Sequence, residues 1–419
     1  MDSVILIQLL LIIIIALIAV YTVLRLKKID IFSPLYIFPL AYVFYLFIGS
    51  LLQDEYIISS QQWFYYLLGL ICFSVGCAIP LLKSMVWKQE NGEGKKKWDG
   101  RRLLVTTVAI FCVAVVARSL IYLKSGIPLL SKDIFATRLD VSASGYLGEI
   151  AMSTEIVFMV SVAGLILFKK YRLPFAGLLI LSFVLALLSG TRTSLIRQLV
   201  PGIVLFHYIV KKISMKAVAF LVLISLVFIG SMNLLRVYRV WGSATLDDLA
   251  QRNYKPAFYW VYFVFRDFKH GPEGFARVLE MIPSQYGYQW GKLHLAPFLM
   301  PFPGNQPPPG VILKDMAGLE FVGVGMAATM LAAQYADFGL VGIMVGMFLV
   351  GIVYEHVYLL ARRRKHPFHY LVLGAITITF ILGIRTDYLN FEILWTIILL
   401  AIIHFFARSR GPLTSSIKE

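Results

Sequence analysis

The chain is dominated by apolar runs of about the length that a helix needs to cross a lipid bilayer. About ten runs of roughly twenty residues follow one another, in a sequence of 419 residues that is 59% hydrophobic. The bilayer core holds no water to bind backbone groups, so these runs must form helices, and their residues do not alternate as those of a membrane barrel do. The sequence predicts an all-α, polytopic integral membrane protein with a single membrane domain over 1–419.

Clusters of lysine and arginine between the apolar runs predict how the chain is threaded. The connection 83–102 is the most basic in the sequence, and the positive-inside rule therefore places it in the cytoplasm. Counting outward from it gives about eleven spans, with the N-terminus outside and the C-terminus in the cytoplasm. The expected spans are 4–24, 32–52, 63–82, 103–123, 150–168, 174–188, a run that ends at Lys211, 217–235, 338–360, 367–384 and 389–406.

The formal net charge of +16 does not indicate a nucleic-acid partner. The basic residues sit in short clusters at the ends of spans, where they direct insertion and contact membrane lipids. Three cysteines, Cys72, Cys77 and Cys112, lie within expected spans and form neither a disulfide framework nor a metal-ligand spacing. Neither an H-E-x-x-H motif nor a glycine-rich phosphate loop is present, so we expect no metal, no cofactor and no nucleotide substrate.

The longest stretch outside the expected spans, 236–337, is too polar and too rich in proline to cross lipid. Its aromatic runs at 258–265 and 286–291, and its proline-containing stretch at 297–309, are typical of short helices in the headgroup region. We expect this extracytoplasmic loop to cover the functional site.

Residues 321–360 could hold either one span or two. Two spans would place the basic cluster 362–365 outside, against the positive-inside rule. We therefore expect one span from Phe338 to Leu360, preceded by a small-residue helix over 323–335 that rests on or dips into the outer face. Such a segment is tolerated at membrane depth where protein surrounds it or where it lines a cavity.

Seven arginines are expected at the outer ends of helices or in the outer loop. Arginine keeps its charge in an apolar site and offers a planar fork for phosphate oxygens, so this group suits a diphosphate; each arginine could instead anchor a helix end. We favour diphosphate binding for two of them. Arg192 lies in a tight turn on the outer side, where the positive-inside rule predicts few basic residues, and Arg385 could be oriented by Asp387. The seven are Arg118, Arg138, Arg192, Arg236, Arg239, Arg266 and Arg385.

A general base should be a carboxylate or a histidine near the same surface. Glu320, Asp315 and His294 lie in the outer loop, and each could accept a proton or be an ordinary solvated or capping residue. Glu155 and Glu392, near outer helix ends, are second-line candidates. Aromatic residues could stack on sugar rings or anchor the loop at the interface, and those expected to bind are Tyr286, Tyr288, Trp290 and Tyr335.

Five short motifs in this order resemble those of Wzy-type polymerases of O-antigen or capsule repeat units. The likeness covers most of the chain after the third expected span, and the plan is also similar to O-antigen ligases and to the shape and division cell-wall polymerases. The motifs are Gly126-Ile127-Pro128-Leu129-Leu130 with downstream Arg138, Ser189-Gly190-Thr191-Arg192-Thr193-Ser194, the outer loop rich in tyrosine and proline, Gln334-Tyr335-Ala336-Asp337-Phe338-Gly339, and Arg385-Thr386-Asp387.

The resemblance implies a glycosyltransferase that joins undecaprenyl-diphosphate-linked repeat units at the outer face of the bacterial cytoplasmic membrane. It implies that Arg192 and Arg385 bind the diphosphate or the glycan, with Arg138 and Arg118 as further candidates. The ligases are thought to use a histidine just before a late span as base; here that helix has none, and Glu320 is the nearest ionisable substitute. A chain-length regulator and a flippase are partners that the resemblance allows.

Three alternatives belong to other classes. A ligase would share the arginines and transfer the glycan to a lipid core or to protein. A polysaccharide or lipid transporter would need polar residues or broken helices near the midplane of the bilayer, whereas the centres of these spans are nearly uncharged. A membrane scaffold would not need a group of outer arginines.

Overall fold

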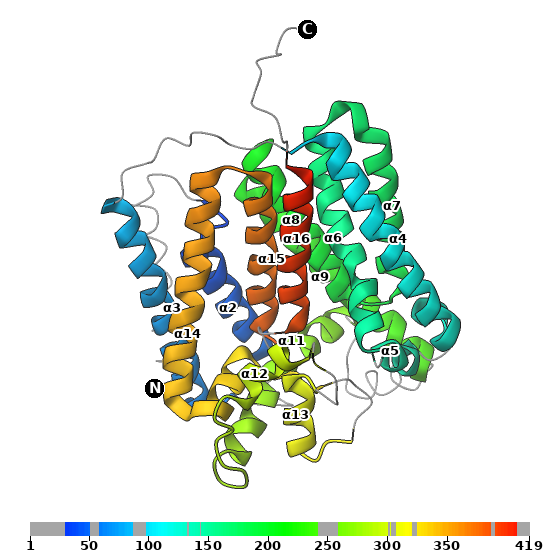
Figure 1. The fold of residues 1–419 in the computed structure, drawn as a ribbon. Coiled ribbons are helices and arrows are strands. Elements are labelled where there is room, and N and C mark those ends of the chain that lie inside the picture. Colours follow the sequence, from blue (N-terminus) through cyan, green and yellow to red (C-terminus); the bar gives the residue numbers. More distant parts are fainter. Residues whose placement is uncertain are drawn as a thin grey trace.

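The computed structural model is a helical bundle whose helices follow the apolar runs (Figure 1). It describes residues 30–50, 58–86, 98–131, 134–142, 144–241, 259–300, 302, 307–320, 325–386 and 390–408. Within these ranges the chain forms no β-strand, and Trp98 and Arg408 make an isolated bridge. The helices are α2 (Pro34–Ser50), α3 (Ser60–Val86), α4 (Gly100–Ser125), η1 (Pro128–Leu130), α5 (Ile134–Ser142), α6 (Tyr146–Leu167), η2 (Lys169–Tyr171), α7 (Arg172–Leu188), α8 (Arg192–Ile209), α9 (Met215–Trp241), α11 (Tyr259–Met281), α12 (Lys292–Leu299), α13 (Pro309–Met316), α14 (Met330–Arg364), α15 (Pro367–Gly383) and α16 (Phe391–Ala407).

Several helices have the length and composition of membrane spans, which confirms the all-α, multi-pass class. Among the described residues, six helical segments are long and apolar enough to cross a membrane, and three apolar helices are shorter. The first expected span, 4–24, lies outside the described residues, and the total of about eleven stays a prediction. The six are Ser60–Leu81, Gly100–Leu130, Tyr146–Leu167, Lys169–Leu188, Lys216–Leu235 and Met330–Arg364, and the shorter three are Pro34–Gly49, Pro367–Gly383 and Phe391–Ala407.

Glycines let the central helices approach one another closely. A Cβ on Gly76 of α3 would clash with the carbonyl of Phe348 in α14, and a Cβ on Gly351 of α14 would clash with the carbonyl of Phe73 in α3. The Cys77 thiol donates to the Gly351 carbonyl across the same contact (3.3 Å). Apolar side chains gain little by leaving lipid for protein, so backbone proximity of this kind is how membrane helices gain packing energy.

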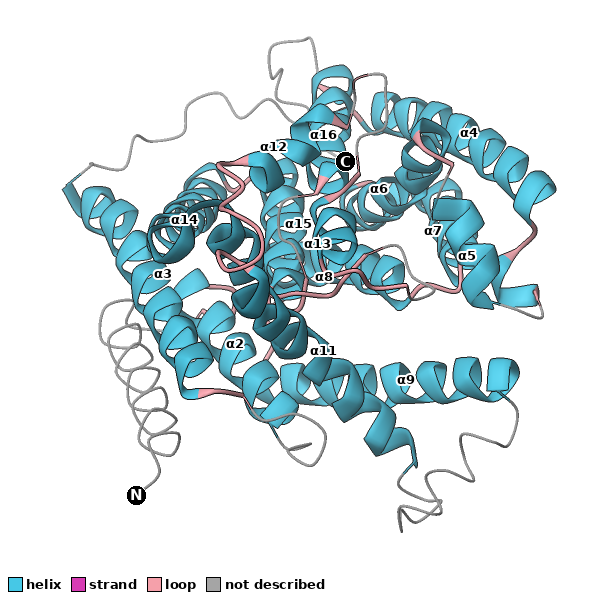
Figure 2. Ribbon diagram, turned by 90° about the horizontal axis from the view of Figure 1, so that it is seen from below, coloured by secondary structure: helices cyan, strands magenta, loops and turns pink. Residues whose placement is uncertain are grey.

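Three helices from the stretch 236–337 lie at one end of the bundle. In Figure 1, α11, α12 and α13 lie at the lower end, beneath α15 and α16 and beside the lower end of α14, and Figure 2 shows α9 lengthwise beside α11. The aromatic run at 258–265 opens α11, which continues to Met281 and is longer than expected. Residues 242–258 of the loop lie outside the described part of the chain.

The stretch before the long part of α14 corrects one expectation. Helix begins at Met330 and not at 323; residues 325–329 are not helical, and 321–324 lie outside the described residues. The helix is interrupted at Phe338 and Gly339, where φ of Gly339 is 62°, and a Cβ on Gly342 would clash with the carbonyl of Gln334. The segment 330–337 therefore folds back against the long helix, and all of its residues are buried.

Candidate active site

Three arginines from distant parts of the chain converge at the end of the bundle that carries the loop helices. Arg138 lies in α5, Arg192 is the first residue of α8, and Arg385 follows α15. Burial lowers the pKa of Arg138, and the positive charges of Arg192 and Arg385 lower it further. Like charges have this effect only at short range, so the three guanidinium groups form one cluster. We call these three residues the arginine cluster.

The tight turn between α7 and α8 places Arg192 beside Arg138. Gly190 has φ of 63°, a left-handed conformation that glycine adopts without strain. A Cβ at Gly190 would lie 3.7 Å from the backbone nitrogen of Leu129 and from Cγ2 of Ile134, so the turn packs on η1 and on the start of α5. Two motifs that are far apart in the sequence thus meet, and each brings an arginine.

Helix α11 covers Arg385. A Cβ on Gly271 of α11 would lie 3.0 Å from the carbonyl oxygen of Arg385, and one on Gly274, a turn further along, would clash with the carbonyl of Ala327. Ala327 precedes the buried segment 330–337. The same face of α11 therefore contacts the arginine cluster and the approach to that segment.

Arg118 has a different environment from the arginine cluster. Its side chain is 6% exposed, and one guanidinium nitrogen donates to the carbonyl of Ala151 (2.9 Å) and to Oγ1 of Thr154 (3.2 Å) in α6. The other terminal nitrogen donates to the carbonyl of Leu185 in α7 (3.2 Å). Arg118 ties α4, α6 and α7 together, and these contacts favour the structural alternative over substrate binding.

The two second-line carboxylates, Glu155 and Glu392, are both paired with side chains of α8. Ser194 donates a short hydrogen bond to Glu155 (2.5 Å), and Arg197 forms an ion pair with Glu392. Ser194 and Arg197 both belong to the first turns of α8, so these contacts fix the end of the helix that carries Arg192. Partners that hold a binding residue in place are as necessary to a site as the residue itself.

A histidine and a buried carboxylate form a pair at the start of α12. Asp337 is fully buried and accepts from the backbone nitrogens of Leu293 (3.2 Å) and His294 (3.0 Å), which complements the helix dipole. Its Oδ2 also lies 2.6 Å from Nδ1 of His294. We assign the ring proton to Nδ1, because the carboxylate that already accepts from two backbone nitrogens is suited to accept from the ring as well, and this assignment leaves the ring lone pair on Nε2.

Three of the four aromatic candidates, Tyr288, Trp290 and Tyr335, lie in the segments that carry or adjoin this pair. The backbone nitrogens of Gln289 and Trp290 donate to the carbonyls of Ala336 (2.9 Å) and Asp337 (3.1 Å), which fastens the loop before α12 to the end of segment 330–337. Tyr288 packs edge-on against Tyr335 (6.2 Å between ring centroids). Trp290 is 76% exposed, so its ring is accessible to a large ligand, whereas Tyr335 is buried.

The remaining candidates lie elsewhere or outside the described residues. Glu320 is exposed in the connection after α13, and Tyr286 is exposed before α12. The backbones of Arg236, Arg239 and Arg266 belong to α9 and α11, but the positions of their side chains lie outside the description, as does the whole of Asp387. Within the described ranges, no group of three or more His, Cys, Asp and Glu residues is arranged to hold a metal ion.

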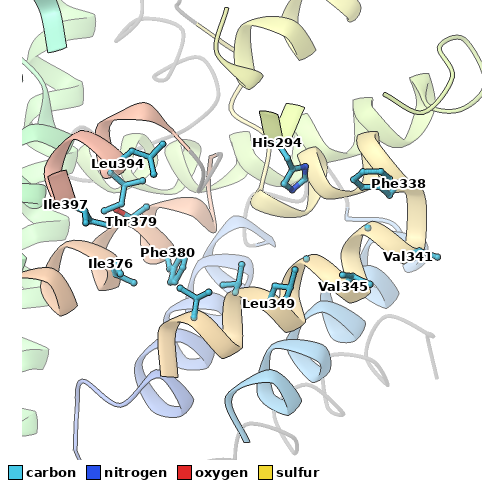
Figure 3. Close-up of a pocket in the computed structure, with 15 residues that line it drawn as sticks. His294, Phe338, Val341, Val345, Leu349, Ile376, Thr379, Phe380, Leu394 and Ile397 are labelled. Carbon is cyan, nitrogen blue, oxygen red and sulfur yellow. The ribbon is translucent and has the colours of Figure 1, made fainter. Parts of the chain in front are cut away.

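His294 also lies at one end of a cavity of about 540 Å³ between α14, α15 and α16 (Figure 3). Sequence reasoning named His294 but missed Asp337 as its partner. Asp337 is the lone charged residue between Glu320 and Glu355, and an isolated ionisable group in an apolar run is usually functional or paired. That signal could have found it.

The fold and this site define a multi-pass membrane protein with an arginine cluster and a histidine–carboxylate pair at one end of its bundle. A family model described as "Putative O-antigen polymerase" matches residues 30–255, just over half of the chain. The protein belongs to the O-antigen polymerase family, which confirms the resemblance that the motifs indicate. The match includes Arg138 and Arg192 and ends before α11. No curated protein and no solved structure matches the chain.

Membership of this family supports polysaccharide polymerisation at a membrane, through an activity of the glycosyltransferase type. It also implies lipid-linked glycans as substrates.

Proposed function

We propose that this protein transfers a growing glycan from its undecaprenyl-diphosphate carrier to a hydroxyl group of an incoming lipid-linked repeat unit. The observation that carries the proposal is the convergence of Arg138, Arg192 and Arg385 from three separate elements, close enough for their charges to interact. Three planar guanidinium groups that keep their positive charge are suited to bind a multiply charged anion such as a diphosphate.

The arginine cluster stabilises the leaving group. As the bond between the anomeric carbon and the diphosphate oxygen breaks, the electron pair stays on that oxygen, and the cluster offsets the developing negative charge. The positive charge comes from side chains already in place, so the transfer proceeds without a metal ion. A single displacement at the anomeric carbon inverts its configuration.

His294 takes the proton from the acceptor hydroxyl. Asp337 holds the ring through Nδ1 (2.6 Å), so Nε2 accepts the proton while the hydroxyl oxygen attacks the anomeric carbon. The buried carboxylate then stabilises the imidazolium ion that forms. This assignment replaces Glu320, whose exposed position after α13 gives it no comparable support.

The outer loop contributes binding. Helix α11 packs on the backbone of Arg385, and the exposed ring of Trp290 offers a stacking surface for a sugar together with Tyr288 and Tyr286. The reaction takes place at the outer face of the bacterial cytoplasmic membrane and yields O-antigen, capsule or exopolysaccharide. A chain-length regulator and a flippase are its proposed partners.

The test is to incubate purified protein with a defined undecaprenyl-diphosphate-linked repeat unit in the presence of EDTA and to separate the products by size. A ladder of longer glycans with inverted linkages is expected. If no ladder forms but the glycan is transferred to a suitable lipid-core acceptor, the protein is a ligase. If neither product forms, the result favours a transporter.

Matched arginine variants make the test specific. We expect Arg192→Ala to abolish the ladder and Arg192→Lys to restore part of it, because lysine keeps the charge but loses the planar fork. Arg101→Ala, an exposed arginine on α4, should leave the ladder unchanged. Normal polymer from Arg192→Ala at normal expression would overturn the enzymatic role of the cluster.

A further inference from the structure

An apolar groove runs along the long part of α14 and begins at His294. Its walls are α14 and α16, which both pack on α15, and Figure 3 shows side chains from all three helices turned toward it. On α14 the wall is a stripe at every fourth residue, Val341, Val345, Leu349 and Val353, as expected for one face of a helix. The four side chains are 63%, 51%, 51% and 48% exposed.

Apart from His294, the lining of the groove offers no polar group to a ligand. Thr379 is the one polar side chain in the lining besides His294, and its hydroxyl donates to the carbonyl of Ala375 (2.8 Å). From Phe338 to Val353 the groove follows about 22 Å of helix, which is a large part of a hydrocarbon layer of about 30 Å. The shape and chemistry suit one extended hydrocarbon chain.

Arg385 lies at the end of α15 that is nearer to α12, the helix that carries His294 (Figure 1). Phe380 lines the groove on α15 and packs on Tyr354 of α14 (5.3 Å between ring centroids), and Arg385 follows Phe380 by about one and a half helical turns. The arginine therefore lies beside the groove. Ile393 lines the groove from the first turn of α16, the helix that follows Arg385. An occupant would therefore have an apolar tail along α14 and an anionic head at the arginines.

The geometry points to this groove as the site for the polyprenyl chain of the lipid-linked substrate. The inference rests on the proposed function and adds to it the place and direction of the tail. A phospholipid has two tails and one phosphate, whereas a polyprenyl diphosphate has one chain and two phosphates, and the three positive charges of the arginine cluster match the second of these. Burial of the polyprenyl chain contributes binding energy at a distance from the anomeric carbon. It also holds the diphosphate at a fixed position relative to His294.

The experiment uses undecaprenyl diphosphate that carries a diazirine within the first isoprene units, with a phospholipid bearing the same diazirine in one tail as comparison. After irradiation of the full-length protein in nanodiscs, crosslinked peptides are identified by mass spectrometry. Crosslinks in α14, α15 and α16 with the polyprenyl probe alone are expected. Equal labelling by the phospholipid, or crosslinks confined to other helices, would overturn the inference.

A pair of neighbouring variants supplies the control. Val345→Trp fills the groove, whereas Met344→Trp adds the same ring at an exposed position on the same helix that does not line it. We expect Val345→Trp to raise the KM for the undecaprenyl-linked repeat unit about tenfold, the effect of losing roughly two buried methylene groups, and to leave a short-tailed analogue unaffected. Equal effects of both variants on the KM would refute the assignment of the groove to the polyprenyl chain. A wild-type protein that is inactive on both the undecaprenyl-linked substrate and the short-tailed analogue would instead refute the proposed function.

Discussion

At the level of single residues, the arginine cluster brings like charges together. Burial and two neighbouring cations lower the pKa of Arg138, so the folded protein opposes the charge of this side chain. Binding residues often cost stability in this way, because they are placed for a charge that arrives with the substrate.

Removing one charge from the cluster should stabilise the protein and inactivate it. We expect Arg138→Met to raise the Tm of the detergent-purified protein by about 2–4 °C, equivalent to about 1 kcal/mol, while the glycan ladder disappears. Inorganic diphosphate should raise the Tm of wild type more than that of the variant. Arg277→Met, at an exposed position on α11, is the control and should change neither. A lower Tm for Arg138→Met would contradict the repulsion argument.

Asp337 should act through His294 and not on the substrate itself. In Asp337→Asn the amide oxygen still accepts from the start of α12, but the charge that orients and supports the imidazole is lost. We expect kcat to fall about 100-fold or more with KM nearly unchanged. The double variant Asp337→Asn with His294→Gln should be no slower than His294→Gln alone, since the two residues work as a unit. Additive losses would show that Asp337 has a separate role.

At the level of elements, the interruption of α14 decides where Asp337 lies. Sequence reasoning found a small-residue segment before a span that begins near Phe338, but it placed the helix at 323–335 and not at Met330. The turn depends on Gly339 in a left-handed conformation and on close approach at Gly342. Neither requirement can be read from hydropathy, because a glycine in an apolar run is equally compatible with a straight helix.

The fold-back of segment 330–337 should be sensitive to a single methyl group. We expect Gly342→Ala to destabilise the protein by about 1–3 kcal/mol, because its Cβ meets the backbone carbonyl of Gln334, which cannot move as a flexible side chain would. Activity should fall as well, since Asp337 moves with the segment. Thermal unfolding and the ladder assay measure both effects.

Gly177 in α7 provides the control for that prediction. A Cβ there meets nothing within 4 Å, so Gly177→Ala should leave activity intact and stabilise the protein by up to about 1 kcal/mol through helix propensity alone. The fold-back would be in doubt if the two alanine variants behaved alike.

For the molecule as a whole, the sequence predicted correctly which helix ends lie at the same end of the bundle. It was less successful in predicting which side chains contact one another there. Reading apolar runs with their basic flanks put Arg138, Arg192 and Arg385 at one end of the bundle, where they do converge. It put Arg118 there too, but hydropathy does not reveal the carbonyls of α6 and α7 that engage it. His294 and Asp337 stand 43 residues apart, and only the fold-back brings them together.

The orientation of the bundle in the membrane can be tested by labelling cysteines from each side. Single cysteines at Ser284, exposed after α11, and at Lys365, exposed after α14, would be introduced after Cys72, Cys77 and Cys112 are replaced. A membrane-impermeant maleimide applied to intact cells should label Ser284→Cys and not Lys365→Cys, and inverted vesicles should give the opposite pattern. The physical reason is that the basic cluster Arg362 to Lys365 is retained in the cytoplasm. Labelling of both positions from the same side would mean that the long part of α14 does not cross the membrane, and labelling of Lys365→Cys alone in intact cells would place the arginine cluster on the cytoplasmic side.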